Sequence, residues 1–132
     1  MREILFRGKR IDNGEWVVGI TWIFSPPVDK AVIVYAMGLV GEDDDASRYC
    51  ECHEVDPSTI GQYTGLTANG KKIFEGDIVA TPKYNGVVVY GTGCYCIKHG
   101  NNSPAIDIVM NVFDVYIIGN IHDNPELMED KP

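Results

Sequence analysis

The first part of the chain has a period-two pattern of large apolar side chains. Four large apolar residues recur at every second position: Trp16, Val18, Ile20 and Trp22. This period predicts a strand over residues 15–24 with those side chains on one face. An Asp-Asn-Gly turn at residues 12–14 joins it to a strand predicted over residues 3–9. Two prolines at residues 26–27 then end the ladder, and a third strand is predicted over residues 31–37.

Turn residues divide the rest of the chain into short apolar runs. Asn69-Gly70 lies between the runs 60–66 and 71–74 and is a strong hairpin signal. Asn85-Gly86 predicts another hairpin turn, and the apolar run 87–90 after it is typical of a strand buried on both faces. Further short strands are predicted over residues 49–55, 78–80, 106–112 and 113–118.

The segment 56–59 is predicted to form a turn or a single helical turn. Asp56 can cap it, and Pro57 is pre-set for the first helical position. This segment is the candidate junction between two lobes, residues 1–55 and 56–132, of one domain that spans residues 1–132.

One helix signature stands near the end of the chain, over residues 124–129. Asn124 supplies a cap, Pro125 fits the first turn, and Glu126 is favourable to the helix dipole. The whole pattern therefore predicts a mainly β, hairpin-rich protein with a short C-terminal helix.

The composition is that of a folded protein inside a cell. The chain has 132 residues, 45% of them hydrophobic, which suffices for one domain with a buried core. Its net charge of −8 disfavours autonomous binding of nucleic acid, because proteins that grip phosphate backbones usually carry a basic face. No apolar run is long enough to span a bilayer, and Glu3 stands where a signal peptide would be basic. We expect a cytoplasmic protein with reduced cysteines.

The acidic run at residues 42–45 is predicted to be a solvated loop, because four like charges beside a glycine do not pack together. Calcium loops alternate carboxylates with spacers and place a glycine at the sixth position. This run lacks that spacing, so no metal is assigned to it.

Two Cys-x-Cys pairs are weak candidates for a zinc site. Their members are Cys50, Cys52, Cys94 and Cys96. Residues two apart on a strand share a face, so two such strands side by side could offer four thiolates to zinc. The spacing differs from that of zinc knuckles, and cysteine is often buried for packing alone. We therefore favour buried or idle thiols, and expect no metal and no cofactor.

The sequence shows no arrangement typical of catalysis. The histidines His53, His99 and His122 lie outside any recognisable nucleophile motif. Glu75 and Asp77 could act as an acid–base pair, but Glu-Gly-Asp is also what a tight bend into a strand requires. No phosphate-binding glycine loop is present. We expect no catalytic residues and a protein that is not an enzyme.

Aromatic side chains are frequent enough to form a stacking platform for bases. The candidates are Trp16, Trp22, Tyr35, Tyr63, Tyr84, Tyr90 and Tyr116. Such a platform also needs a basic track, and the available lysines are too few to outweigh the acids: Lys71, Lys72, Lys83 and Lys98. Core packing or a protein interface is favoured for these aromatics, because they dominate both.

Several motifs occur in a fixed order along nearly the whole chain. They are Arg-Glu-Ile-Leu-Phe-Arg at 2–7, Val-Asp-Pro-Ser-Thr-Ile-Gly-Gln-Tyr-Thr-Gly-Leu at 55–66, Asn-Gly-Lys-Lys-Ile-Phe-Glu-Gly-Asp-Ile-Val at 69–79, and Ile-Gly-Asn-Ile-His-Asp-Asn-Pro-Glu-Leu at 118–127. On these motifs the chain resembles the phage YopX protein family. The cysteine pairs lie outside the matching segments, as do residues 24–49 and 81–114.

The resemblance implies a fold and an origin. Members are small, mostly β proteins with a partly open, SH3-like barrel region, encoded in phages, prophages and related mobile elements. The resemblance implies no catalytic residues. The motif residues are expected to determine the fold, with Gly61, Gly65, Gly70 and Gly76 at turns and Ile60, Leu66, Ile73, Ile78 and Val79 in the core.

The expected function is that of a non-enzymatic phage or prophage accessory protein that acts through protein contacts. β edges and exposed aromatics would form the interface of a homo-oligomer, with an unknown phage or host protein as further partner. One alternative is a small-barrel module that binds nucleic acid. Another is an acidic decoy that mimics nucleic acid, for which the hints are residues 43–45, Glu126, Glu129 and Asp130.

Overall fold

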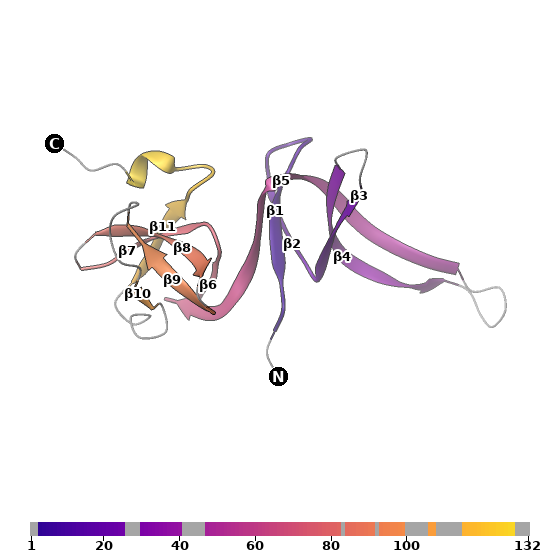
Figure 1. Ribbon diagram of the computed structural model, residues 1–132. Helices are drawn as coiled ribbons and strands as arrows, with labels where there is room; N and C mark the ends of the chain where they lie inside the picture. The colour runs from indigo at the N-terminus through magenta and orange to yellow at the C-terminus, as the bar shows by residue number, and fades with distance from the viewer. Residues whose placement is uncertain are drawn as a thin grey trace. The chain divides into compact units, whose positions relative to one another are not determined.

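A computed structural model describes residues 3–25, 30–40, 47–82, 84–91, 93–99, 106–107 and 115–128. In these ranges the chain forms antiparallel strands and one 3-10 turn (Figure 1). The elements are β1 Phe6–Arg10, β2 Trp16–Gly19, β3 Thr21–Ser25, β4 Lys30–Val40, β5 Ser47–Ala68, β6 Lys71–Phe74, β7 Asp77–Ala80, β8 Asn85–Gly91, β9 Cys94–Lys98, β10 Ile106–Asp107, β11 Tyr116–Asn120 and the 3-10 turn η3 Pro125–Met128. The prediction of a mainly β protein is confirmed, and none of the described helices is long and apolar enough to cross a membrane.

The chain divides into two compact units. The N-terminal unit is Glu3–Gln62, and the C-terminal unit is Tyr63–Pro132 together with Met1–Arg2. The division falls inside β5, a strand of 22 residues that contributes to both units. The predicted single domain over residues 1–132, with lobes 1–55 and 56–132, stays a prediction.

The N-terminal unit is built on an antiparallel sheet with the strand order β2-β1-β5-β4-β3. Its buried cluster consists of Ala31, Ile33 and Val55, against which Phe6, Val17 and Ile60 pack. Gly8 packs against the side chain of Val55, and a Cβ atom on Gly8 would stand only 2.9 Å from the Cγ2 methyl of that valine. Close approach of β1 to β5 therefore requires glycine at this position.

The strand predicted over residues 15–24 is interrupted at Ile20. β2 pairs with β1, whereas β3 pairs with β4, so the chain changes its partner strand at the bend. The amide of Ile20 donates to the carbonyl of Val34 at 2.8 Å, and a Cβ atom on Gly19 would overlap the same carbonyl. The prediction of one face for all four apolar residues is thus wrong. Val18 pairs with Arg7 on one strand, while Trp22 pairs with the core residue Ile33 on another.

The segment 56–59 does not end a strand but forms a bulge within β5. Lys9 pairs with Asp56 and Arg7 with Gly61, so several β5 residues oppose the single Gly8. The buried hydroxyl of Thr59 accepts from the Lys9 amide at 2.8 Å and donates to the Asp56 carbonyl at 2.6 Å. The predicted turn is therefore present as local side-chain bonding, but β5 continues through it.

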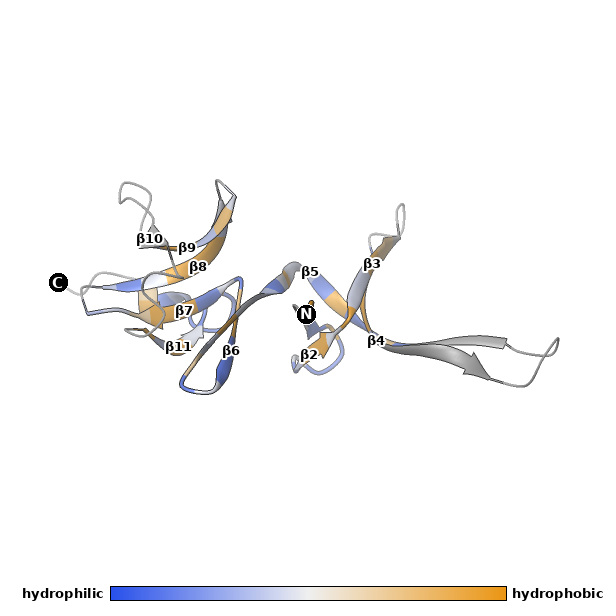
Figure 2. Ribbon diagram, turned by 90° about the horizontal axis from the view of Figure 1, so that it is seen from below, coloured by the Kyte–Doolittle hydropathy of each residue, from blue (hydrophilic) through white to orange (hydrophobic). Residues whose placement is uncertain are grey.

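The C-terminal unit contains an antiparallel sheet with the strand order β10-β9-β8-β7-β11, and β6 pairs with β5. Hydrophobic segments are visible on β7 and β8 (Figure 2). The buried cluster is Ala68, Ile73, Val79, Val88, Ile97 and Val115. Among the described strands this sheet has two open ends and does not close into a barrel.

The glycines of the sequence motifs have the expected roles only in part. Asn69 and Gly70 both have positive φ, at 51° and 80°, and form the predicted tight turn between β5 and β6. Gly76, with φ of 90°, forms the predicted bend into β7. Gly65 lies inside β5, where its φ of 87° coincides with a register shift, and Gly61 is also within that strand.

The hairpin turn predicted at Asn85-Gly86 is wrong, because both residues lie inside β8. The turn occurs earlier, where the Thr81 amide donates to the Tyr84 carbonyl at 2.9 Å. Gly86 serves close packing instead: a Cβ atom there would overlap the Cγ2 methyl of the buried Ile97. The strand over residues 87–90 is also not buried on both faces, since burial alternates along it.

The predicted C-terminal helix is a 3-10 turn of four residues. The Leu127 amide donates to the Asn124 carbonyl three residues back, at 3.0 Å. Asn124 does not cap its own turn, because its side chain accepts from the Asn120 amide at 3.3 Å. The Leu127 carbonyl in turn accepts from the Asn85 side chain at 3.0 Å, which ties the turn to β8.

The two last predicted strands lie partly outside the described residues. Of the range 106–112, only Ile106–Asp107 is described, as β10. Of the range 113–118, the part from Val115 onward is described, and β11 begins at Tyr116. The predicted acidic loop at 42–45 is also outside the described residues.

The packing role of Gly86 can be tested by Gly86→Ala. We expect this change to lower the free energy of unfolding by about 1–3 kcal/mol, because the new methyl group must displace the buried Ile97. Urea denaturation followed by circular dichroism measures the loss. Gly91→Ala is the matched control on the same strand, where nothing lies within 4 Å of the new Cβ, and it should change stability by less than about 0.5 kcal/mol. Equal effects of the two changes would contradict the packing role.

The bulge in β5 can be tested by Thr59→Val. This change keeps the shape of the side chain but removes the acceptor of the Lys9 amide, so we expect a loss of about 1–3 kcal/mol in the free energy of unfolding. Ser58→Ala is the control, because Ser58 is exposed and bonds only locally to Asp56. A Thr59→Val protein as stable as the Ser58→Ala protein would show that the bulge does not depend on this hydroxyl.

Candidate functional site

The edge strand β3 exposes three large apolar side chains in a row. Trp22 is 41% exposed, Ile23 50% and Phe24 41%. In the strand order of the N-terminal unit β3 stands at one end, and its described pairing is with β4 alone. Trp22 pairs with Ile33, so it lies on the face of the sheet that carries the core, and Ile23 lies on the opposite face.

The sequence of β3, Thr-Trp-Ile-Phe-Ser, contains no charged residue. Natural proteins usually protect edge strands with charges, bulges or a covering segment, because the unpaired backbone groups would otherwise recruit another strand. A strand edge that is both apolar and uncharged is typical of a surface that another chain covers. We name Thr21–Ser25 the β3 edge.

Further exposed apolar residues of the same unit include Val18, Ile20 and Tyr35, at 44%, 47% and 39%. Tyr35 follows Val34 at a register shift between β4 and β5. Its ring stacks on the imidazole of His53, with the ring centroids 5.1 Å apart and the planes at 21°. This stacking gives the tyrosine a fixed orientation, which favours a role in recognition.

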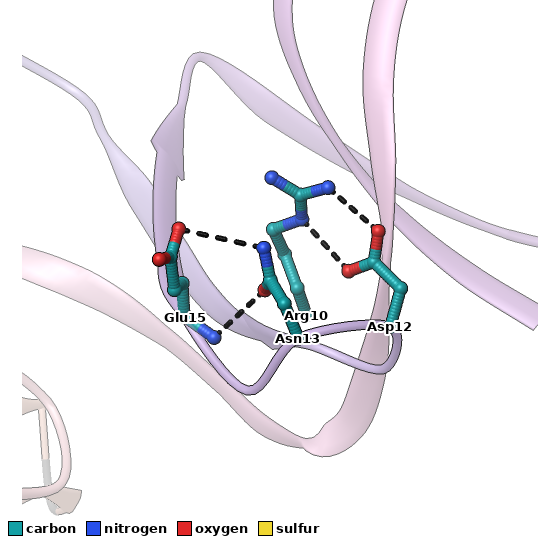
Figure 3. Close-up of polar contacts among 4 residues, drawn as sticks. All are labelled: Arg10, Asp12, Asn13 and Glu15. Atoms are coloured by element: carbon teal, nitrogen blue, oxygen red, sulfur yellow. Dashed lines mark hydrogen bonds and ion pairs between the residues drawn. The ribbon is translucent and has the colours of Figure 1, made fainter.

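The turn between β1 and β2 is held by polar side chains that reach across it (Figure 3). Arg10 donates from Nε and Nη2 to the two carboxylate oxygens of Asp12, at 2.9 and 2.6 Å. This bidentate contact lowers the pKa of Asp12 and raises that of Arg10. Asn13 accepts from the Glu15 amide at 2.9 Å and donates to its carboxylate. All four side chains serve the turn conformation.

The cysteine pairs lie on strands of different sheets. Cys50 and Cys52 belong to β5 and pair with β4, while Cys94 and Cys96 belong to β9 and pair with β8. The Sγ atoms of Cys94 and Cys96 are 3.5 Å apart, which confirms that residues two apart share a face here. No group of three or more potential metal ligands occurs among the described residues. The weak zinc hypothesis stays a prediction.

The three histidines lie in separate surroundings. The imidazole of His99 stacks on Tyr84 with centroids 4.7 Å apart, and its Nδ1 is 2.8 Å from the Asn85 carbonyl. His122 is exposed beside η3, and its amide donates to the Asn120 side chain at 3.0 Å. His53 stacks on Tyr35.

Of the candidate acid–base pair, Asp77 is buried, with 3% of its surface exposed. Its Oδ2 accepts from the Phe74 amide at 2.8 Å, across the bend that Gly76 makes. A carboxylate held in this way fixes the bend between β6 and β7, as a structural role requires. Glu75 lies half-buried at the same bend.

A comparison with known families identifies the chain. The YopX protein family matches residues 6–129, nearly the whole length. The chain belongs to the YopX family. Four residues of the sequence motifs lie in this range and each fixes a bulge, a turn or a bend: Thr59, Gly70, Gly76 and Asp77.

A solved structure supports the fold of this YopX family member. The chain is similar to protein EF1440 from Enterococcus faecalis, with a TM-score of 0.66 and 25% sequence identity. The likeness covers 98% of this chain and 100% of that one. The chain matches none of the curated proteins with which it was compared.

The aromatic residues of this YopX family member do not lie on one unit. Trp16, Trp22 and Tyr35 belong to the N-terminal unit, and the candidate tyrosines after them belong to the C-terminal unit. Tyr63 is buried, at 7% exposure, and Tyr84 packs against the core. Tyr90 and Tyr116 are exposed, at 59% and 58%. Lys83, Glu129 and Asp130 are outside the described residues, as is the acidic run.

Sequence reasoning named Trp22 but missed Ile23 and Phe24. It treated residues 15–24 as one strand with Trp16, Val18, Ile20 and Trp22 on one face, so Ile23 and Phe24 were not considered as part of an exposed edge. The uncharged run Thr21–Ser25 ahead of Pro26 was a signal for a separate edge strand. Proline is tolerated in edge strands and interrupts the hydrogen bonds between strands, because it has no amide donor.

Proposed function

We propose that the protein is a non-enzymatic accessory protein of phage or prophage origin that acts through protein contacts, as a homo-oligomer, in the host cytoplasm. The observation that carries the proposal is the β3 edge, an uncharged strand whose described pairing is with β4 alone and which has three half-exposed large apolar side chains. Membership of the YopX family supports the origin. We also propose that the C-terminal unit has the partly open, SH3-like barrel that the family resemblance implies.

A second copy is the occupant that best fits the β3 edge. Two identical edges can pair antiparallel about a two-fold axis, so that each satisfies the unpaired amide and carbonyl groups of the other. Pairing also covers part of Trp22, Ile23 and Phe24, and because each is only half-exposed, its gain stays below the roughly 1.5–3 kcal/mol of full burial. An uncharged strand has no like charges that would oppose its own copy.

The residues around the β3 edge enlarge the contact. A stable interface buries roughly 800 Å² on each partner, more than a strand of five residues supplies alone. Ile20 directly precedes β3, and Tyr35 follows Val34, the partner of Thr21, so these two exposed residues would extend it. The stacked pair of Tyr35 and His53 supplies a rigid aromatic anchor of the kind enriched in interfaces.

The oligomer is tested by Ile23→Lys. A lysine in the middle of the β3 edge places two like charges next to each other in the paired strands, so we expect a dimer to become a monomer. Multi-angle light scattering after size exclusion, over a range of concentrations, gives the mass. Ile118→Lys is the matched control, because Ile118 is 40% exposed on β11, an edge strand of the C-terminal unit.

The expected result is a dimer for the unchanged protein and for Ile118→Lys, and a monomer for Ile23→Lys. A strict monomer at high concentration for the unchanged protein would overturn the oligomer. A dimer that is lost only in the Ile118→Lys protein would assign the interface to β11 instead of the β3 edge.

Binding of nucleic acid is tested separately. With a net charge of −8, we expect no retention of single- or double-stranded probes even at low salt. Fluorescence anisotropy with labelled oligonucleotides, measured at several salt concentrations, provides the readout. Binding that weakens steeply as salt rises would favour the alternative of a small-barrel nucleic-acid module over the proposed function.

A further inference from the structure

The thiols of Cys94 and Cys96 form a close pair on β9. Their Sγ atoms are 3.5 Å apart, and both side chains leave the strand on the same side. The residues between and after them point the other way: Ile97 is a member of the buried cluster of the C-terminal unit, and Tyr95 packs against that cluster. The thiol pair therefore lies on the face of the sheet that does not carry this core.

The two thiols differ in their access to solvent. Cys94 is half-buried, whereas only 7% of Cys96 is exposed. Cys94 pairs with Gly91 next to the β8–β9 connection, and its Sγ is 3.7 Å from the Gly91 carbonyl. A reagent in solution therefore reaches Cys94 more readily than Cys96, whose Sγ lies 3.5 Å from that of Cys94.

We propose that Cys94 and Cys96 form a dithiol exchange site that a low-molecular-weight disulfide, such as oxidised glutathione, converts reversibly into an intrastrand disulfide. The inference does not rest on the proposed function, since it concerns the C-terminal unit and needs no second copy. Cys94 is the attacking thiol, and Cys96 is the resolving thiol.

The exchange proceeds in two steps. The Cys94 thiolate attacks one sulfur of the small disulfide, a bond forms between the two sulfurs, and one small thiol leaves. The Cys96 thiolate then attacks Sγ of Cys94, and the second small thiol leaves. The protein loses two protons and two electrons, the small disulfide gains both, and the products are one protein disulfide and two small thiols.

The strand geometry makes the product easy to reduce. Residues two apart on an extended strand have Cα atoms about 6.5 Å apart, which is near the upper limit for a disulfide. A disulfide that joins Cα atoms at this upper limit forms under strain. Strained disulfides have more oxidising potentials and belong to the labile class, which is what a reversible site needs.

The site is tested in the full chain with Cys50 and Cys52 replaced by serine, so that Cys94 and Cys96 are the remaining cysteines. The folded protein is treated with oxidised glutathione, quenched with acid and weighed by intact mass spectrometry. We expect the mass to fall by two hydrogen atoms, and reduced glutathione to restore it. Adding Cys96→Ser should stop the reaction at a stable adduct with one glutathione, because the resolving thiol is gone.

Adding Cys94→Ser instead should slow the reaction on the order of tenfold, because access limits the buried Cys96. Repeating each reaction in urea removes the difference if it arises from burial, and circular dichroism checks that each variant is folded. A stable glutathione adduct on the protein that keeps both thiols would overturn the proposal. So would an unchanged mass, or a disulfide between two chains.

Discussion

The fold depends on the hydrogen bonds of one buried hydroxyl group. Thr59 Oγ1 accepts from the Lys9 amide and donates to the Asp56 carbonyl, and thereby holds a bulge in the middle of β5. β5 pairs with β1 and β4 before it pairs with β6, so a single strand contributes to both units. Loss of the bulge would shift the register of β1 and move its side chains to the other face.

Two glycines then allow neighbouring strands to lie closer together than any side chain would permit. Gly8 lets β1 lie against Val55, and Gly19 lets the chain bend past the Val34 carbonyl. The bend sends the chain from β2 into β3 on a different partner strand. The β3 edge is a consequence of this bend, because an unbroken strand would have kept these residues paired with β1. The proposed interface and the core therefore both depend on glycines that allow close approach between neighbouring strands.

Some features could be predicted because a single local requirement decided them. Asn69-Gly70 was read correctly, since a tight turn demands two residues that tolerate positive φ and few dipeptides supply them. The same dipeptide at Asn85-Gly86 led to the prediction of a turn that the structure does not have. There the glycine is needed because Ile97 packs against it, and Ile97 lies on another strand, so the residues around Gly86 in the sequence do not show this need. The bend at Ile20 was not predicted because it also depends on a residue of another strand, Val34, whose carbonyl accepts from the Ile20 amide.

The sequence predicted the type of surface that forms the candidate site, but not which strand carries it. Exposed aromatics and β edges were expected to form an interface, and Trp22 was among the residues named. Which strand would form an edge depends on the order of strands in the sheet, and that order follows from long-range pairing. The contact between the Cys94 and Cys96 thiols, by contrast, follows from strand periodicity alone.

The central claim is that a second copy covers the β3 edge, and hydrogen exchange tests it most directly. Amide exchange of Thr21–Ser25 is followed by mass spectrometry on dilute and concentrated samples, with β11 as internal reference. Pairing between copies predicts that exchange in Thr21–Ser25 slows as concentration rises while exchange in β11 stays constant. Equal exchange of Thr21–Ser25 at both concentrations would contradict the account.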